Sequence, residues 1–182
     1  MESCETLHHR TLKVSDGQLA VASPSVPLDR NIPLFYDTSN TSGFTVKQEL
    51  LTKHSPTRAQ WKDIEFGWPV AKEMGRLDVG QTITVKDRSV VAIEALEGAD
   101  ECILRSGKLC RGFIVIKIAK PRQDDTPSDP PTFGMTTIKN IVEAGGKALV
   151  VEADRTMFTG HEDVIDYADK NSVAIILNDE EI

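Results

Sequence analysis

The sequence predicts one α/β domain, a mixed β-sheet packed by helices, that follows an irregular N-terminal segment. Three apolar runs are typical of buried strands, at residues 113–119 (FIVIKIA), 147–153 (KALVVEA) and 173–177 (VAIIL). Segments with helical periodicity alternate with these runs, which is the order of elements in α/β proteins. A chain of 182 residues suits one such domain and a tail. We expect the domain at residues 45–182.

Residues 1–44 contain no sustained hydrophobic period. Prolines stand among serines and threonines there, so we expect an irregular, flexible segment with at most a short strand near residues 18–22. This segment is not expected to hold a core of its own.

The domain is expected to begin with a helix. Ser55 is a candidate N-cap, Pro56 fits the first helical position, and Gly75 can close the last turn. Pro69 removes one internal hydrogen bond and is expected to kink this helix at a cost of ~3 kcal/mol. The apolar residues of one helix face are Trp61, Ile64, Trp68, Ala71 and Met74.

A β-hairpin is predicted next, because two β-branched runs, residues 82–86 (TITVK) and 89–95 (SVVAIEA), are separated only by Asp87 and Arg88. A short helix at residues 99–109 then leads to the first buried strand. The remaining elements are a helix capped by Thr136 or Thr137 and closed by Gly145 and Gly146, the second buried strand, a helix at 161–171 and the last buried strand.

Charge and composition exclude several classes of function. The formal net charge is −7 and the isoelectric point is near 5.1, whereas a nucleic-acid surface needs a basic stripe. The three cysteines lack metal-site spacing, and their odd number indicates free thiols in a reducing compartment. No apolar run approaches the ~20 residues that span a bilayer, and the first ten residues do not resemble a signal peptide. We therefore expect a cytoplasmic protein that does not bind nucleic acid.

The sequence also lacks the motifs of common cofactor and catalytic sites. Neither the dinucleotide fingerprint nor the P-loop occurs, HExxH is absent, and the four histidines share no ligand spacing. A dinucleotide, zinc or serine-hydrolase site is therefore not predicted.

Two lysines mark the exit of the first buried strand. Lys117 lies within the apolar run, where an ammonium group is costly unless it finds an anion, and Lys120 follows it. A bound phosphate is one such anion. An ion pair with Glu94 or Asp129 is the structural alternative.

Further candidate residues lie at the two ends of the predicted hairpin. Asp78 and Gly80 precede it; the glycine allows close backbone approach to a ligand, while the structural alternative for Asp78 is a turn residue. Glu94 ends the second strand and is expected to face the side of the sheet opposite to its neighbour. For Glu97 and Gly98 the structural interpretation, a solvated turn before a helix, leads.

A proline-rich loop between residues 120 and 132 carries the last candidate group. Asp124, Asp125 and Asp129 follow Gln123, and acidic oxygens in one loop can hold Mg²⁺ and orient a water molecule. The alternative is a polar surface loop.

Together these segments resemble a known family. The run from residue 51 (LTKHSPTRAQWKDIEFGWPVAKEMGRLDVGQTITVKDRSVVAIEALEGADE), with IVIKIAKPRQDD, SDPPTFGMTTI and VEADRT, is similar to the C-terminal domain of the LpxI-type UDP-2,3-diacylglucosamine pyrophosphatases. The resemblance covers about residue 45 to the end of the chain.

The resemblance implies Mg²⁺-dependent hydrolysis of UDP-2,3-diacylglucosamine to UMP and 2,3-diacylglucosamine 1-phosphate (lipid X) in lipid A synthesis. It also implies that the glycolipid is held between this domain and a Rossmann-like N-terminal domain, with peripheral contact to the inner membrane. The family's pattern maps substrate binding onto Asp78, Gly80, Gln81, Glu97, Gly98, Lys117, Lys120 and Gln123, catalysis onto Asp129 and Asp124, and metal binding onto Asp129, Asp124 and Glu94.

The chain departs from the family's pattern in two ways that affect function. Residues 125–128 fill the link between the two loop aspartates, where an arginine is usual, with one residue inserted. We also expect the Rossmann-like first domain of the family to be missing, because residues 1–44 are too short and too irregular to replace it. We therefore expect weak hydrolysis or none by the chain alone. The alternatives are a non-catalytic domain that binds a lipid phosphate or nucleotide sugar, and an interaction domain that kept only the fold.

Overall fold

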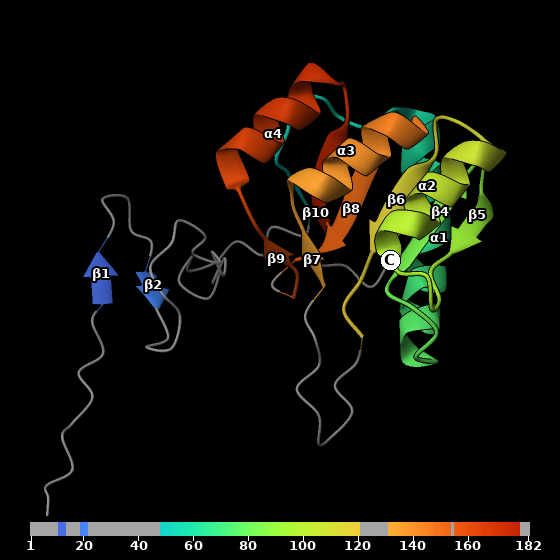
Figure 1. Cartoon of the computed structure of the whole chain (residues 1–182), viewed down its shortest axis with the longest axis horizontal. Coiled ribbons are helices and arrows are strands. Elements are labelled where there is room, and N and C mark those ends of the chain that lie inside the picture. The colour runs from blue at the N-terminus through green and yellow to red at the C-terminus, as the bar shows by residue number, and fades with distance from the viewer. Residues whose placement is uncertain (1–10, 14–18, 22–47, 121–130, 154, 179–182) are drawn as a thin grey trace, which may run out of the picture.

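In the computed structural model, the described residues are 11–13, 19–21, 48–120, 131–153 and 155–178. They form a six-stranded mixed sheet with four helices, and two small two-stranded sheets (Figure 1). This arrangement confirms the predicted α/β fold.

The main sheet combines parallel and antiparallel strands. Its strands are β3 (Gln48–Leu50), β4 (Thr82–Lys86), β5 (Ser89–Ile93), β6 (Ile114–Lys117), β8 (Ala148–Glu152) and β10 (Ala174–Asn178). Their order in space is β3-β10-β8-β6-β4-β5. β6, β8 and β10 are parallel to one another, while β3 and the β4–β5 hairpin extend the sheet with antiparallel pairing on either side.

Helices cover both faces of this sheet. They are α1 (Arg58–Arg76), α2 (Ala99–Leu109), α3 (Met135–Ala144) and α4 (His161–Lys170). α1 lies on one face and α2, α3 and α4 lie on the other (Figure 1). In β6, Ile114 and Ile116 join the core under α1, whereas Val115 joins the core under the other three helices. Cover on both faces explains why this strand is almost continuously apolar.

The first helix begins two residues later than the sequence analysis predicts. The N-cap is Thr57 and not Ser55, because the Thr57 hydroxyl accepts a hydrogen bond from the Gln60 amide at 3.3 Å. The Gln60 side chain in turn accepts from the Thr57 amide at 2.7 Å, which completes a capping box. The helix continues through Pro69 to Arg76, and the expected kink at the proline stays a prediction.

Several short elements were not predicted. β7 (Thr132–Phe133) and β9 (Met157–Phe158) pair in parallel, and the rings of their two phenylalanines stack with centroids 4.2 Å apart. In α3 the N-cap is Gly134, so the prediction of Thr136 or Thr137 was wrong. β1 (Thr11–Lys13) pairs with β2 (Leu19–Val21), the short strand that was expected.

The four helices of the described residues do not meet the requirements of a membrane span. None of them combines the length and the apolar composition that such a span needs.

The turn of the β4–β5 hairpin is left-handed at both of its central residues. Asp87 has φ 51° and Arg88 has φ 57°, as two-residue hairpins require, although neither is the glycine that adopts this conformation without cost. Asp63 of α1, only 2% exposed, accepts a hydrogen bond from the Arg88 amide at 2.7 Å. The buried carboxylate of Asp63 thus stabilises a left-handed turn that Asp87 and Arg88 do not favour by themselves.

Replacing Asp63 with alanine is predicted to lower the free energy of unfolding by about 2 kcal/mol, because the Arg88 amide loses a charged acceptor. Urea denaturation followed by circular dichroism measures this change. The control is Glu65→Ala, on the exposed face of the same helix, which should change stability by less than about 0.5 kcal/mol. Equal effects of the two substitutions would contradict this account of the turn.

Candidate functional site

The carboxyl ends of the parallel strands meet at one edge of the sheet. β6, β8 and β10 end there at Lys117, Glu152 and Asn178, all of which are buried. β4 begins at the same edge, because Thr82 pairs with Lys117. We call this region the carboxyl edge. Ligands of open α/β sheets bind at this position, so it is where the predicted site residues are expected.

Lys117 supplies a buried cation at the carboxyl edge. It is 8% exposed, and its Nζ donates a hydrogen bond to the carbonyl oxygen of Thr132. It lies on the face covered by α2, α3 and α4, since it alternates with Ile116, which packs under α1. Thr132 begins β7, so this contact brings β7 and the start of α3 against the end of β6. The predicted lysine is therefore at a position where several elements converge.

Lys120 and Asp78 form an ion pair near the same edge. The Lys120 Nζ lies 2.5 Å from Asp78 Oδ1, and the side chains are 31% and 56% exposed. Asp78 also has a left-handed backbone with φ 56°, in the turn that follows α1. It is therefore a turn residue, as the structural alternative held, and also a partner of the second predicted lysine.

Gly80 is required by packing within the protein. A Cβ atom at this position would lie 2.1 Å from the carbonyl oxygen of Glu94, so the loop before β4 lies directly against the segment that follows β5. The neighbouring Gln81 accepts a hydrogen bond at its carbonyl from the Ile118 amide at 2.9 Å. Both predicted residues therefore lie at the carboxyl edge, but the close approach at Gly80 is to protein backbone.

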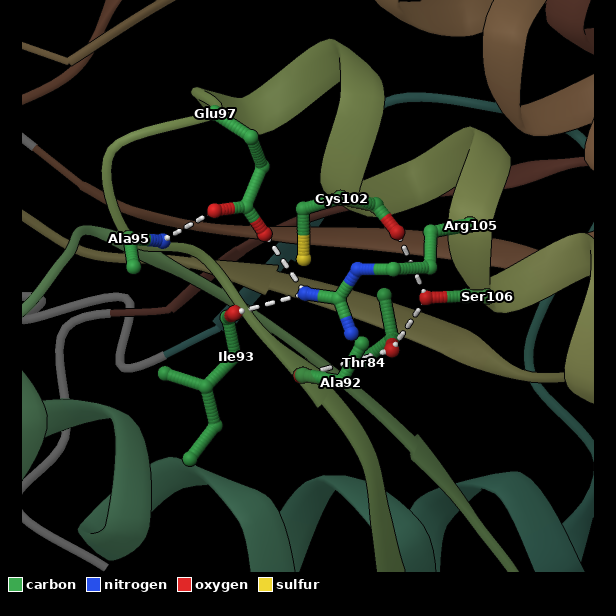
Figure 2. A network of polar contacts seen from close by, with 8 residues as sticks. All are labelled: Thr84, Ala92, Ile93, Ala95, Glu97, Cys102, Arg105 and Ser106. Carbon is green, nitrogen blue, oxygen red and sulfur yellow. Dashed lines mark hydrogen bonds and ion pairs between the residues drawn. The ribbon is translucent and has the colours of Figure 1, made fainter.

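Glu97 holds the turn between β5 and α2. Its Oε1 lies 2.6 Å from Arg105 Nη2, its Oε2 accepts from the Ala95 amide at 3.2 Å, and Arg105 also donates to the Ile93 carbonyl (Figure 2). The hydrogen bond from Arg105 lowers the pKa of Glu97 below its ordinary value. Gly98, with φ 83°, is the N-cap of α2. These contacts support a structural role for the turn.

Glu94 faces the same side of the sheet as Lys117, since it follows the Ile93–Ile83 pair and lies opposite Thr82, and it forms no ion pair with another described residue. Its amide donates to the Thr82 carbonyl at 2.8 Å, so Glu94, Thr82 and Lys117 stand in a row across three strands. Within the described residues, buried atoms Glu94 Oε2 and Thr82 Oγ1 have no hydrogen-bond partner. A Lys117–Glu94 ion pair is therefore not formed, while the other structural alternative, Asp129, lies outside the described residues.

Glu152 is a charged residue of this edge that the sequence analysis missed. It is 6% exposed, and its Oε1 lies 2.7 Å from the Nζ of Lys72 and 3.6 Å from the Nε of Arg155. Its Oε2 accepts from the Ala119 amide at 2.9 Å. The only signal in the sequence was an acidic residue that ends an apolar run. Glu152 fixes the backbone between the two predicted lysines.

Of the three predicted metal ligands, Asp124, Asp129 and Glu94, only Glu94 lies within the described residues. No group of three or more His, Cys, Asp or Glu side chains that could hold an ion occurs in the described ranges. Gln123, Asp124, Asp125 and Asp129 lie outside them. The metal and catalytic assignments of these residues therefore stay predictions.

Two of the three cysteines are described, and both are free thiols. Cys102 of α2 is fully buried, and burial raises its pKa to about 11. Because the thiolate is the reactive form, Cys102 is suited to packing and not to nucleophilic attack. Cys110, which ends α2, is partly exposed.

Alkylation with iodoacetamide at pH 8 is predicted to modify Cys110 well before Cys102 in the native chain. The Cys102 thiol stays protonated until the pH approaches about 11, and it is also shielded from the reagent. Peptide mapping by mass spectrometry measures both sites, and unfolding in urea should equalise their rates. Fast modification of Cys102 in the folded chain at pH 8 would contradict its assignment as a core residue.

Comparison with known proteins matches this chain to a family model and to a curated relative. The model of a family described as the LpxI C-terminal domain matches residues 47–176. A curated relative, the UDP-2,3-diacylglucosamine pyrophosphatase LpxI of Caulobacter vibrioides (strain ATCC 19089 / CIP 103742 / CB 15), is 36% identical over 134 residues. The alignment covers 69% of this chain and 48% of the relative. The chain thus spans about half the length of the curated relative it matches.

Proposed function

The chain belongs to the LpxI C-terminal domain family, and from this premise we propose that it acts in hydrolysis of UDP-2,3-diacylglucosamine. The products are UMP and 2,3-diacylglucosamine 1-phosphate. The single observation that carries this proposal beyond the family match is the fixed cation of the carboxyl edge. Lys117 is 8% exposed where three parallel strands end, and a fixed ammonium group stabilises the charge of a pyrophosphate.

Lys117 and Lys120 are the proposed ligands of the pyrophosphate oxygens. Lys117 is held in place by Thr132 and by the packing of β6, so little reorganisation is needed when the substrate binds. Lys120 is half-buried, and its partner Asp78 is exposed. Exposed ion pairs contribute little stability, so Lys120 exchanges Asp78 for a phosphate oxygen at small cost.

Mg²⁺ is the proposed cofactor, with Asp124 and Asp129 as its main protein ligands. Their donor set is oxygen only, which is the set Mg²⁺ prefers. Among the described residues no group of three or more His, Cys, Asp or Glu side chains could hold an ion, so the proposal assigns ion binding to this pair of aspartates. When bound, Mg²⁺ neutralises charge on the non-bridging oxygens. Asp129 is the residue proposed to orient the attacking water, and Gln123 is a proposed substrate ligand.

Exposed apolar side chains beside the carboxyl edge support a lipid substrate. Leu77 and Val79 lie in the loop before β4, Leu96 lies in the loop after β5, and they are 52%, 44% and 103% exposed. The contact between Gly80 and Glu94 holds the two loops together. We propose that these side chains meet the acyl chains of the glycolipid at the cytoplasmic surface of the inner membrane.

The chain alone is predicted to release UMP from UDP-2,3-diacylglucosamine slowly or not at all, although it folds. It spans about half of the relative's length, and a site shared by two domains cannot fix the pyrophosphate with one of them. Adding the N-terminal part of the Caulobacter vibrioides relative as a separate chain should raise UMP release, measured by chromatography with Mg²⁺ present.

Lys117→Met is the matched variant for this assay, because it keeps the aliphatic stem and removes the charge. It should abolish the rescued activity while the added N-terminal part stays the same. No rescue of the parent by a folded partner would favour the alternative, a non-catalytic domain that binds the phosphorylated lipid. Fast release of UMP by the lone chain would contradict the need for a second domain.

A further inference from the structure

The row of Glu94, Thr82 and Lys117 lies on one face of the sheet. Thr82 pairs with Lys117 of β6 on one side, and on the other its carbonyl oxygen accepts a hydrogen bond from the Glu94 amide. The side chains that alternate with this row point into the core under α1, as their packing shows; they are Ile83, Ile93 and Ile116. The three polar side chains therefore share the face that α2, α3 and α4 cover.

Two atoms of this row are buried without partners. Thr82 is 1% exposed, and its Oγ1 has no hydrogen-bond partner among the described residues. Glu94 Oε2 is buried and unpaired in the same part of the chain, although Glu94 as a whole is partly exposed. An unsatisfied buried polar group costs about 1–3 kcal/mol, and native structures contain few of them. The two residues are joined by a backbone hydrogen bond and lie at the carboxyl edge, which is where ligands of open α/β sheets bind.

Thr84 shows that a buried threonine on this face can be satisfied by the protein. It lies two residues after Thr82 on the same strand and is 0% exposed. Its Oγ1 lies 2.7 Å from the hydroxyl of Ser106 and 3.5 Å from the carbonyl of Ala92, and Ser106 also donates to Cys102 (Figure 2). The difference between the two threonines is position, because Thr82 lies at the edge where the ligand is expected.

We propose that Thr82 and Glu94 together bind a hydroxyl group of the substrate's sugar, beside the phosphate held by Lys117. This inference rests on the proposed function and names the part of the substrate that the row recognises. Glu94 can only accept hydrogen bonds, whereas Thr82 both donates and accepts one. Their complement is a neutral group that donates and accepts, as an alcohol does. A phosphate does not fit, because the Glu94 carboxylate repels it.

A hydroxyl ligand also accounts for the order of charges along the row. The anionic end at Glu94 and the cationic end at Lys117 are separated by one strand. A sugar phosphate carries a neutral ring with alcohol groups next to an anionic group, so it matches this order. The row therefore orients the sugar relative to the bond that is hydrolysed, and Thr82 and Glu94 are specificity-determining residues.

The test compares Thr82→Val with its matched control Thr84→Val. Calorimetry measures binding of UDP-N-acetylglucosamine, which carries sugar hydroxyl groups, and of inorganic pyrophosphate, which carries none. Thr82→Val should leave the melting temperature of the unliganded chain unchanged or raised, because it deletes an unsatisfied hydroxyl. It should weaken binding of the sugar nucleotide about tenfold, the loss of one good hydrogen bond, and leave pyrophosphate binding unchanged.

Thr84→Val should give the opposite result. It removes a hydroxyl that has partners, so the melting temperature should fall, while the affinities for both ligands should stay as in the parent. Equal affinity of Thr82→Val and the parent for the sugar nucleotide would overturn the proposal. An equal loss of pyrophosphate and sugar-nucleotide binding in Thr82→Val would also overturn it, because such a loss indicates distortion of the phosphate site. The proposal fails as well if the parent does not bind the sugar nucleotide.

Glu94→Gln separates the hydroxyl site from the metal site that the family resemblance implied for Glu94. Glutamine keeps an acceptor oxygen and the size of the side chain but is a poorer Mg²⁺ ligand. A hydroxyl site predicts an unchanged Mg²⁺ concentration for half-maximal UMP release in the two-part enzyme, and a metal site predicts a higher one. Glu143→Gln, on the exposed face of α3, is the control. A raised Mg²⁺ requirement for Glu94→Gln alone would overturn the hydroxyl assignment.

The readouts distinguish this inference from the proposed function. Binding of the sugar nucleotide and of pyrophosphate is measured without turnover, so a chain that never releases UMP still tests Thr82. Loss of pyrophosphate binding in Lys117→Met, together with unchanged sugar-nucleotide binding in Thr82→Val, would leave the phosphate site standing and remove the sugar site.

Discussion

The register of β4 against β6 is the constraint on which the candidate site depends. It pairs Thr82 with Lys117, and the hydrogen bond from the Ile118 amide to the Gln81 carbonyl continues it past the strand ends. A slip of one residue would turn every side chain of β4 to the other face. Thr82 would then lie under α1, and Ile83 and Val85, which pack there, would face α2. The apolar core thus fixes which polar groups meet at the edge.

A buried carboxylate extends this order into the segment that follows β6. Glu152 ends the neighbouring strand β8 and accepts from the Ala119 amide, two residues after Lys117 and one before Lys120. Lys72 of α1 neutralises it at 2.7 Å, so the charge can stay buried. Glu152 therefore fixes the backbone between Lys117 and Lys120. The side chain of Lys120 can still change partners, because its ion pair with Asp78 is partly exposed.

The sequence was sufficient for the elements whose pattern is long. FIVIKIA, KALVVEA and VAIIL gave the three parallel strands, and the helix over residues 99–109 was placed within its observed bounds. β7 and β9 were not predicted, because a strand of two residues is too short to show a hydrophobic period. Sequence also cannot show which polar atoms stay unpaired: Thr82 and Thr84 look alike along the chain, and only the position of Ser106 separates them. Glu97 was correctly weighed as a turn residue, but its partner Arg105 lies two turns into the next helix and was not foreseen.

The central claim is that this domain binds a sugar phosphate at the carboxyl edge of its parallel strands. Amide chemical shifts of the ¹⁵N-labelled chain, recorded while 2,3-diacylglucosamine 1-phosphate is added in micelles, test it most directly. The account predicts that the largest changes fall on residues 79–82, 94–98 and 117–120, with empty micelles as the reference. Changes confined to the opposite edge, at the Asp87–Arg88 turn and Gly145, or no changes beyond those of empty micelles, would contradict it.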